Sequence, residues 1–86
     1  MTNEEISNAV TRILAKIAPE ARGLTLVPTQ NLRDQLDLDS MDALNFVIAL
    51  DEELGVSIPE SDYAKLTTLE GIVTYLAGRL AAKARV

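Results

Sequence analysis

The sequence predicts an all-α fold: a small four-helix bundle with three longer helices and one short one. Three segments carry apolar residues at intervals of three and four, the spacing of one helical face. The alternating stretch 56–58 is too short to build a sheet alone. Eighty-six residues suffice for one small domain. We therefore expect a single domain over 1–86, with its core over about 4–80 and a frayed tail over 81–86.

The first helix is predicted from Thr2 to about Ala18. Thr2 followed three residues later by Glu5 is the pattern of a capping box, which satisfies free N–H groups at a helix start. Pro19 and Gly23 end the periodic pattern. The apolar residues of this helix form one stripe: Ile6, Val10, Ile13, Leu14 and Ile17.

Residues 19–38 are predicted to be a long connection between the first and second helices. Pro28 and the polar group 29–31 interrupt any helical period. A connection this long in a small domain is expected to be pinned or functional. Scattered apolar residues favour pinning against the bundle: Leu24, Leu26, Val27, Leu32, Leu36 and Leu38.

The second helix is predicted over about 40–54, with Asp39 as its N-cap and Gly55 as its stop. Asp42 adds a negative charge in the first turn, where the helix dipole favours it. This capping leaves Ser40 in the first turn with an exposed hydroxyl. The helix is rich in core candidates: Met41, Leu44, Val47, Ile48 and Leu54, with Phe46 and Leu50 widening the stripe.

Two further helices complete the bundle. Pro59 is expected to open a brief helix over about 60–65. Thr67 with Glu70 then predicts a capping box for the last helix. That helix has a regular apolar stripe: Leu69, Ile72, Val73, Leu76 and Leu80.

The composition excludes several classes of protein. The absence of Cys rules out disulfides and thiolate metal sites, and no apolar run is long enough to span a membrane. The net charge is −5, and 34–62 holds nine acidic residues and no Lys or Arg, which argues against nucleic-acid binding and favours basic partners. Early acidic residues disfavour a secretory signal. We therefore expect a soluble, cytoplasmic monomer.

The run 37–42, Asp-Leu-Asp-Ser-Met-Asp, places Ser40 at a helix start among carboxylates. A catalytic serine needs a base, and this chain has no His. The carboxylates do not follow the spacing of a calcium loop, so no metal site is predicted. No catalytic residue is predicted either. Ser40 is thus either an acceptor modified by another enzyme or a simple helix-start residue, and these residues alone favour neither.

The pattern of residues over about 4–80 resembles the acyl carrier proteins. The resemblance rests on Asp-Ser-Met-Asp at 39–42, on Leu-Asp-Glu-Glu-Leu-Gly-Val-Ser-Ile-Pro at 50–59 and on Leu-Thr-Thr-Leu at 66–69. It implies an acyl-carrier-protein-like bundle that is not an enzyme. The implied cofactor is 4′-phosphopantetheine, attached to Ser40 through a phosphodiester by a separate phosphopantetheinyl transferase that uses coenzyme A and magnesium.

The resemblance also implies partners and site residues. The arm would carry acyl groups as thioesters to acyl-ligases, ketosynthases or acyltransferases with basic docking patches, in fatty acid, polyketide or specialised lipid biosynthesis. The expected docking residues are Asp39, Met41, Asp42, Asp51 and Glu52. The expected cavity for an acyl chain is formed by Leu44, Val47, Ile48, Ile58, Leu66 and Ile72.

Three positions depart from the family pattern. Met41 replaces the usual leucine, Asn45 stands where carriers of fatty acid synthesis often have an acidic residue, and Asp37 replaces a glycine. The helix after Ser40 is therefore less acidic in its middle, which favours a carrier for a specialised pathway. Two alternatives stay open: a carrier of aminoacyl or peptidyl groups, and a helical interaction module that is never modified.

Overall fold

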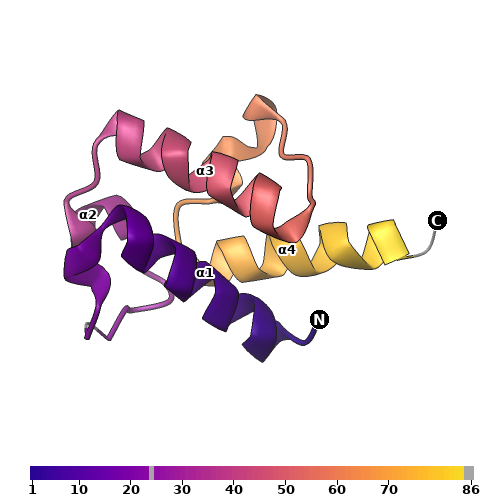
Figure 1. Ribbon diagram of the computed structural model, residues 1–86, viewed down its shortest axis with the longest axis horizontal. Helices are drawn as coiled ribbons and strands as arrows, with labels where there is room; N and C mark the ends of the chain where they lie inside the picture. Colours follow the sequence, from indigo (N-terminus) through magenta and orange to yellow (C-terminus); the bar gives the residue numbers. More distant parts are fainter. Residues whose placement is uncertain (24, 85–86) are drawn as a thin grey trace.

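The computed structural model describes residues 1–23 and 25–84 (Figure 1). The secondary-structure elements in these ranges are helices. In these ranges the only β pairing is an isolated bridge between Asn31 and Thr68. None of the described helices is long and apolar enough to cross a membrane. The all-α class is confirmed. The elements are α1 (Asn3–Ile17), η1 (Pro19–Ala21), α2 (Leu32–Leu36), α3 (Ser40–Leu54), η2 (Glu60–Lys65) and α4 (Leu69–Ala84), where η marks a 3₁₀ helix.

Helix α1 forms as predicted and packs against both α3 and α4. The Thr2 hydroxyl accepts a hydrogen bond from the Glu5 N–H, and the Glu5 carboxylate accepts one from the Thr2 N–H, so the capping box is confirmed. The carboxylate's bonds to Thr2 lower the pKa of Glu5. The predicted stripe is buried except at Ile17, which is partly buried. Each fully buried aliphatic side chain contributes about 1.5–3 kcal/mol to the hydrophobic core.

The long connection predicted over 19–38 contains two short helices that the sequence analysis did not predict, η1 and α2. Helix α2 has only five residues, too few to show a helical period in the sequence. The Asn31 side chain caps it by accepting from the Arg33 N–H. Pinning by buried leucines is confirmed for Leu32, Leu36 and Leu38, whereas Leu24 lies outside the described residues.

Polar contacts also tie this segment to the start of α4. The Gln35 side chain bonds the backbone N–H and C=O of Val27 and the C=O of Gln30, which closes the turn before α2. The Glu70 N–H donates to the Pro28 carbonyl at 3.0 Å. These bonds hold the turn that leads into α2.

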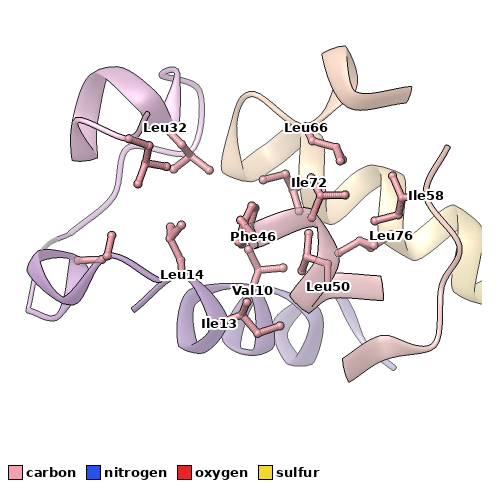
Figure 2. Close-up of a cluster of buried hydrophobic side chains, with 14 of the residues drawn as sticks. Val10, Ile13, Leu14, Leu32, Phe46, Leu50, Ile58, Leu66, Ile72 and Leu76 are labelled. Carbon is pink, nitrogen blue, oxygen red and sulfur yellow. The ribbon is translucent and has the colours of Figure 1, made fainter. Parts of the chain in front are cut away.

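Helix α3 has the predicted bounds and caps, but the prediction of its buried face is partly wrong. Phe46 and Leu50 lie among side chains of α1 and α4, as Figure 2 shows. Met41, Leu44 and Ile48, which were predicted as core, are 63%, 41% and 46% exposed. The apolar residues of α3 lie on more than one face of the helix. Their spacing therefore could not identify the face that α1 and α4 cover. Val47 is buried and Leu54 partly buried, as predicted.

An ion-pair cluster joins the C-terminal turn of α3 to α1. Both Arg12 Nη2 and Lys16 Nζ lie 2.9 Å from the carboxylate oxygens of Glu53. The bonds from Lys16 and then Arg12 lower the pKa of Glu53 below its ordinary value of 4.5. The cluster therefore stabilises the folded state only while Glu53 is ionised.

Replacing Glu53 by Gln is expected to lower the free energy of unfolding at neutral pH. The folded-state pKa is depressed, so the contribution is present above pH 4.5 and is lost as the pH falls through the folded-state value. Denaturant unfolding from pH 7 to pH 3 should show the gap between Glu53→Gln and wild type closing in acid. Glu52→Gln, at an exposed residue, is the control and should show no such gap. A gap that stays constant across this range would contradict the role of the ion pairs.

Helix α4 begins one residue later than its predicted capping box. Its cap is Thr68, not Thr67: the Thr68 hydroxyl accepts from the Gly71 N–H at 3.0 Å. Glycine has no side chain to bond back, so no capping box forms. The predicted α4 stripe is buried or partly buried, as expected. The helix continues to Ala84 rather than fraying from Ala81, and 85–86 lie outside the described residues.

Two basic residues of α4 hold the connection that follows α3. Arg79 donates to the Ser57 carbonyl at 2.6 Å, and Lys83 donates to the Gly55 carbonyl at 2.9 Å. Gly55 has φ +63°, the left-handed conformation that ends α3. These contacts give the basic end of α4 a structural role that its sequence did not reveal.

Candidate functional site

The backbone before Ser40 is anchored by burial and by an unusual turn. Asp37 ends α2 in the left-handed region, at φ 51°, which Asp tolerates better than most residues. Leu38 is buried immediately afterwards, and Arg33 Nε donates to its carbonyl at 3.3 Å. Asp39 then starts α3. The structure thus places Ser40 directly after an anchored turn.

A capping box formed by Asp39 and Asp42 holds the first turn of α3, where the sequence predicted only a cap at Asp39. The Asp39 carboxylate accepts from the Asp42 N–H at 2.8 Å, and the Asp42 carboxylate accepts from the Asp39 N–H at 3.4 Å. Ser40 therefore contributes no capping bond. The box fixes the direction in which the residues of this turn project.

Ser40 is exposed, as predicted, and its hydroxyl has no hydrogen-bond partner in the described part of the chain. The nearest sequence neighbours with ionisable groups are carboxylates, and the chain has no His. Within the described ranges, no group of three or more potential metal ligands occurs. The hydroxyl is thus accessible to an external enzyme, and no base positioned like that of a serine hydrolase accompanies it.

A cavity of about 410 Å³ opens beside Ser40, between α2, α3 and η2. Of the predicted cavity residues, Leu44, Val47 and Leu66 line it. The other three do not: Ile48 is exposed on α3, and Ile58 and Ile72 are buried in the core. The complete lining is Leu32, Arg33, Leu38, Ser40, Ala43, Leu44, Phe46, Val47, Tyr63, Ala64, Leu66 and Thr67.

The wall that η2 contributes to the cavity is attached to α4 by a partly buried tyrosine hydroxyl. Tyr75 Oη donates to Asp62 Oδ2 at 2.6 Å, which lowers the pKa of Asp62. Burial and then this contact raise the pKa of Tyr75. Arg79 stacks on the Tyr75 ring with its guanidinium carbon 5.9 Å from the ring centre. Side chains that do not themselves line the cavity therefore hold the η2 wall against α4.

A glycine permits the close approach of η2 to α4. A Cβ atom at Gly71 would lie 2.8 Å from the Lys65 carbonyl oxygen, a contact that requires the backbone to move. The Leu32 N–H donates to the Thr67 carbonyl at 2.8 Å, so α2 is tied to the residue that follows Leu66. Leu32 and Thr67, which this bond joins, both line the cavity.

A family model described as a phosphopantetheine attachment site matches residues 8–76 of this chain, which include the anchored serine and the cavity. The chain belongs to the acyl carrier protein family. As a member of this family it is a carrier and not an enzyme, and its cofactor is 4′-phosphopantetheine.

Individual relatives agree with this assignment. The acyl carrier protein of Thermosynechococcus vestitus is 32% identical over 85 residues, which cover 95% of this chain and 100% of that protein. The acyl carrier protein of Campylobacter hominis is 33% identical, with 85% of this chain and 86% of that protein covered. The solved structure of the acyl carrier protein from Enterococcus faecalis superposes with a TM-score of 0.73 at 30% identity, covering 92% of this chain and 99% of that one.

The geometry of this acyl carrier protein fits a covalently attached arm. An arm that begins with a phosphodiester needs a hydroxyl that is accessible and uncommitted, and Ser40 meets both conditions. Family membership also implies interaction with a phosphopantetheinyl transferase and with biosynthetic enzymes in general.

The predicted docking residues lie on the outer side of this carrier. Asp39, Met41, Asp51 and Glu52 are exposed, and Asp42 is half-buried by the capping box. Leu44 and Ile48, which sequence reasoning assigned to the cavity, are exposed on α3 as well, and Leu44 also lines the cavity. Residues 41, 44 and 48 follow helical spacing and form one apolar stripe between the acidic ends of α3.

Sequence reasoning missed several cavity residues. Leu32 and Leu38 were predicted only to pin the connection, and Phe46 was assigned to the core. Tyr63 and Arg33 carried no signal, because each lies in a helical element too short for its orientation to be derived from periodicity.

Proposed function

We propose that Ser40 carries the 4′-phosphopantetheine arm and that this protein delivers acyl groups to the enzymes of a lipid or polyketide pathway. The observation that supports this most strongly is the accessible Ser40 hydroxyl, which has no hydrogen-bond partner among the described residues and lines an apolar cavity. The arm supplies a terminal thiol, so a chain without cysteine can carry thioesters.

The residues of this chain have three separate tasks in the proposed function. The Asp39–Asp42 capping box holds the turn that presents Ser40. The cavity offers aliphatic and aromatic side chains to the hydrocarbon part of a cargo, whose transfer out of water is favourable. The outer side of α3 is available to partner enzymes. None of these tasks requires the carrier to perform chemistry.

We propose acyl rather than aminoacyl or peptidyl cargo, because the cavity beside Ser40 is lined predominantly by apolar side chains. The pathway is fatty acid, polyketide or specialised lipid biosynthesis. The shortage of acidic residues in the middle of α3 supports the specialised case. We further propose that the protein is a cytoplasmic monomer that binds neither nucleic acid nor membranes.

Docking on basic patches of acyl-ligases, ketosynthases, acyltransferases and the phosphopantetheinyl transferase is proposed to use α3. Carboxylates lie near both ends of this helix, and the apolar stripe Met41, Leu44 and Ile48 lies between them. Such charges accelerate association by steering, while exposed apolar side chains supply contact area. Asp51 and Glu52 lie in the last turn, where the helix dipole disfavours anions, which supports a role other than stability.

Replacing Asp51 and Glu52 together by Lys is expected to reduce kcat/KM for modification by the transferase about three- to tenfold, because steering is lost. Folding should not suffer, since Lys suits the end of a helix. The matched control replaces Glu4 and Glu20, which are exposed outside α3, by Lys and makes the same change in net charge. Equal kcat/KM losses in the two double variants, or losses unaffected by added salt, would contradict steering by α3.

The experiment that tests the proposed function is intact mass spectrometry after incubation with coenzyme A, magnesium and a broad-specificity phosphopantetheinyl transferase. The expected result is the gain of one phosphopantetheinyl group. Subsequent loading by an acyl-ligase, with an aminoacyl-ligase in parallel, tests the cargo. Loading by the aminoacyl-ligase alone would replace the acyl proposal with the aminoacyl one.

A further inference from the structure

The cavity beside Ser40 contains one charged side chain among its lining residues, that of Arg33. Apolar residues predominate around it, and the polar members Ser40, Tyr63 and Thr67 are uncharged. An arginine at this point is not explained by a hydrocarbon cargo, because burying apolar groups against a cation gains nothing from its charge. The charge of Arg33 therefore indicates a second kind of group at this end of the cavity.

Arg33 is held toward the segment that ends at Ser40. Its Nε donates to the carbonyl of Leu38, two residues before the serine, at 3.3 Å. The two Nη groups have no hydrogen-bond acceptor among residues 1–23 and 25–84. Arg33 also takes part in none of the three ion pairs formed within these ranges. The guanidinium is thus oriented by one bond and keeps its remaining donors available.

The sequence that follows Arg33 is strongly acidic. From Asp34 to Asp62 it holds nine carboxylates and no Lys or Arg. Most of the other described cations already have partners. Arg12 and Lys16 bind Glu53, Lys65 pairs with Asp62, and Arg79 and Lys83 bind backbone carbonyls.

We propose that Arg33 binds the phosphodiester at the base of the arm on Ser40. The proposal rests on the proposed attachment of the arm to that serine. Ser40 and Arg33 line the same cavity, so a phosphate esterified to the Ser40 hydroxyl enters the space that Arg33 faces. A guanidinium presents planar N–H donors that match phosphate oxygens. The contact offsets the repulsion between the phosphate and the surrounding carboxylates.

This contact makes Arg33 a positioning residue. It holds the base of the arm at the mouth of the cavity and does not take part in the transfer reaction. It also makes modification stabilise the fold, because the phosphate binds a folded arrangement of Arg33 and Ser40 that the unfolded chain lacks. If Arg33 only anchored the Leu38 carbonyl, it would stabilise the apo and modified forms equally.

The experiment compares the apo and phosphopantetheinylated forms of wild type, Arg33→Gln and Arg22→Gln. Arg22 is an exposed arginine beside η1 that neither lines the cavity nor takes part in the described ion pairs, so its substitution is a matched loss of charge. Intact mass establishes modification of each sample. Denaturant unfolding of both forms and the ³¹P NMR resonance of the modified form are then measured, without any acyl cargo.

The unfolding constant of the apo form divided by that of the modified form should be about two- to fivefold smaller in Arg33→Gln than in wild type. This is the range expected for an exposed charge pair. The ³¹P resonance of Arg33→Gln should move, while Arg22→Gln matches wild type in both readouts. Arg33→Lys keeps the charge and loses the planar guanidinium, so both of its readouts should lie between those of Arg33→Gln and those of wild type. Equal ratios and an unmoved resonance in Arg33→Gln would overturn the contact alone. Failure of wild type to gain the arm would overturn the proposed attachment and the contact with it.

Discussion

Ser40→Ala is expected to abolish modification by the phosphopantetheinyl transferase while leaving the fold intact. The Ser40 hydroxyl is the proposed site of the phosphodiester, and alanine removes the oxygen on which that bond depends. The capping box of α3 uses Asp39 and Asp42, so the substitution removes no capping bond. The free energy of unfolding should stay within about 0.5 kcal/mol of wild type. Intact mass and denaturant unfolding measure the two effects.

The matched control is Ser61→Ala, because Ser61 is an exposed serine in η2 on the other side of the cavity. This variant should gain the arm as wild type does. Modification of Ser40→Ala to the wild-type extent would move the attachment site to another residue. Loss of modification in both variants would indicate that the transferase needs the cavity region rather than the Ser40 hydroxyl.

Leu50→Ala is expected to destabilise the protein by about 3 kcal/mol, the second large effect. The Leu50 side chain has no exposed surface and lies between α1 and α4 (Figure 2). Truncation removes buried methyl groups and leaves a cavity, a change that costs about 2–5 kcal/mol. Native proteins have a total stability of only about 5–15 kcal/mol. Thermal and denaturant unfolding should therefore show a much lower melting temperature and unfolding midpoint than in wild type.

Ile48→Ala tests the same helix on its outer side. Ile48 is 46% exposed, and alanine is a better helix former, so the loss of stability should stay below about 1 kcal/mol. The effect of Ile48→Ala should instead appear as a slower reaction with the transferase or an acyl-ligase. If Ile48→Ala and Leu50→Ala destabilised the protein equally, the assignment of the buried face of α3 would be wrong.

The N-caps and ends of α1 and α3 were readable from local sequence, whereas the cap of α4 was misplaced by one residue. Thr2 and Glu5 are three residues apart, as are Asp39 and Asp42, and such pairs interact within a single turn whatever the rest of the chain does. The bounds of α1 and α3 were therefore predictable. Helix α2 was not, because its five residues form a helix only when Leu32 and Leu36 find a surface to pack against.

The candidate site divides in the same way. Ser40 was identifiable because the motif around it is contiguous and the chain lacks a histidine base. The cavity was predicted only in part: Leu44, Val47 and Leu66 line it, but Ile48, Ile58 and Ile72 do not. Residues from α2 and η2 complete the lining, and neither element has a period that reveals which side chains face inward.

The helical class, the bounds of α1 and α3 and the serine at the start of α3 follow from local sequence. Each of these depends on residues within one or two turns of each other, where spacing alone decides the contact. Tertiary packing, by contrast, selects which face of α3 is buried and brings the exposed Arg33 to the lining of the cavity beside Ser40. The reason is physical: α3 is apolar on more than one face, and packing against α1 and α4 selects Phe46 and Leu50 and leaves Met41 and Ile48 outside.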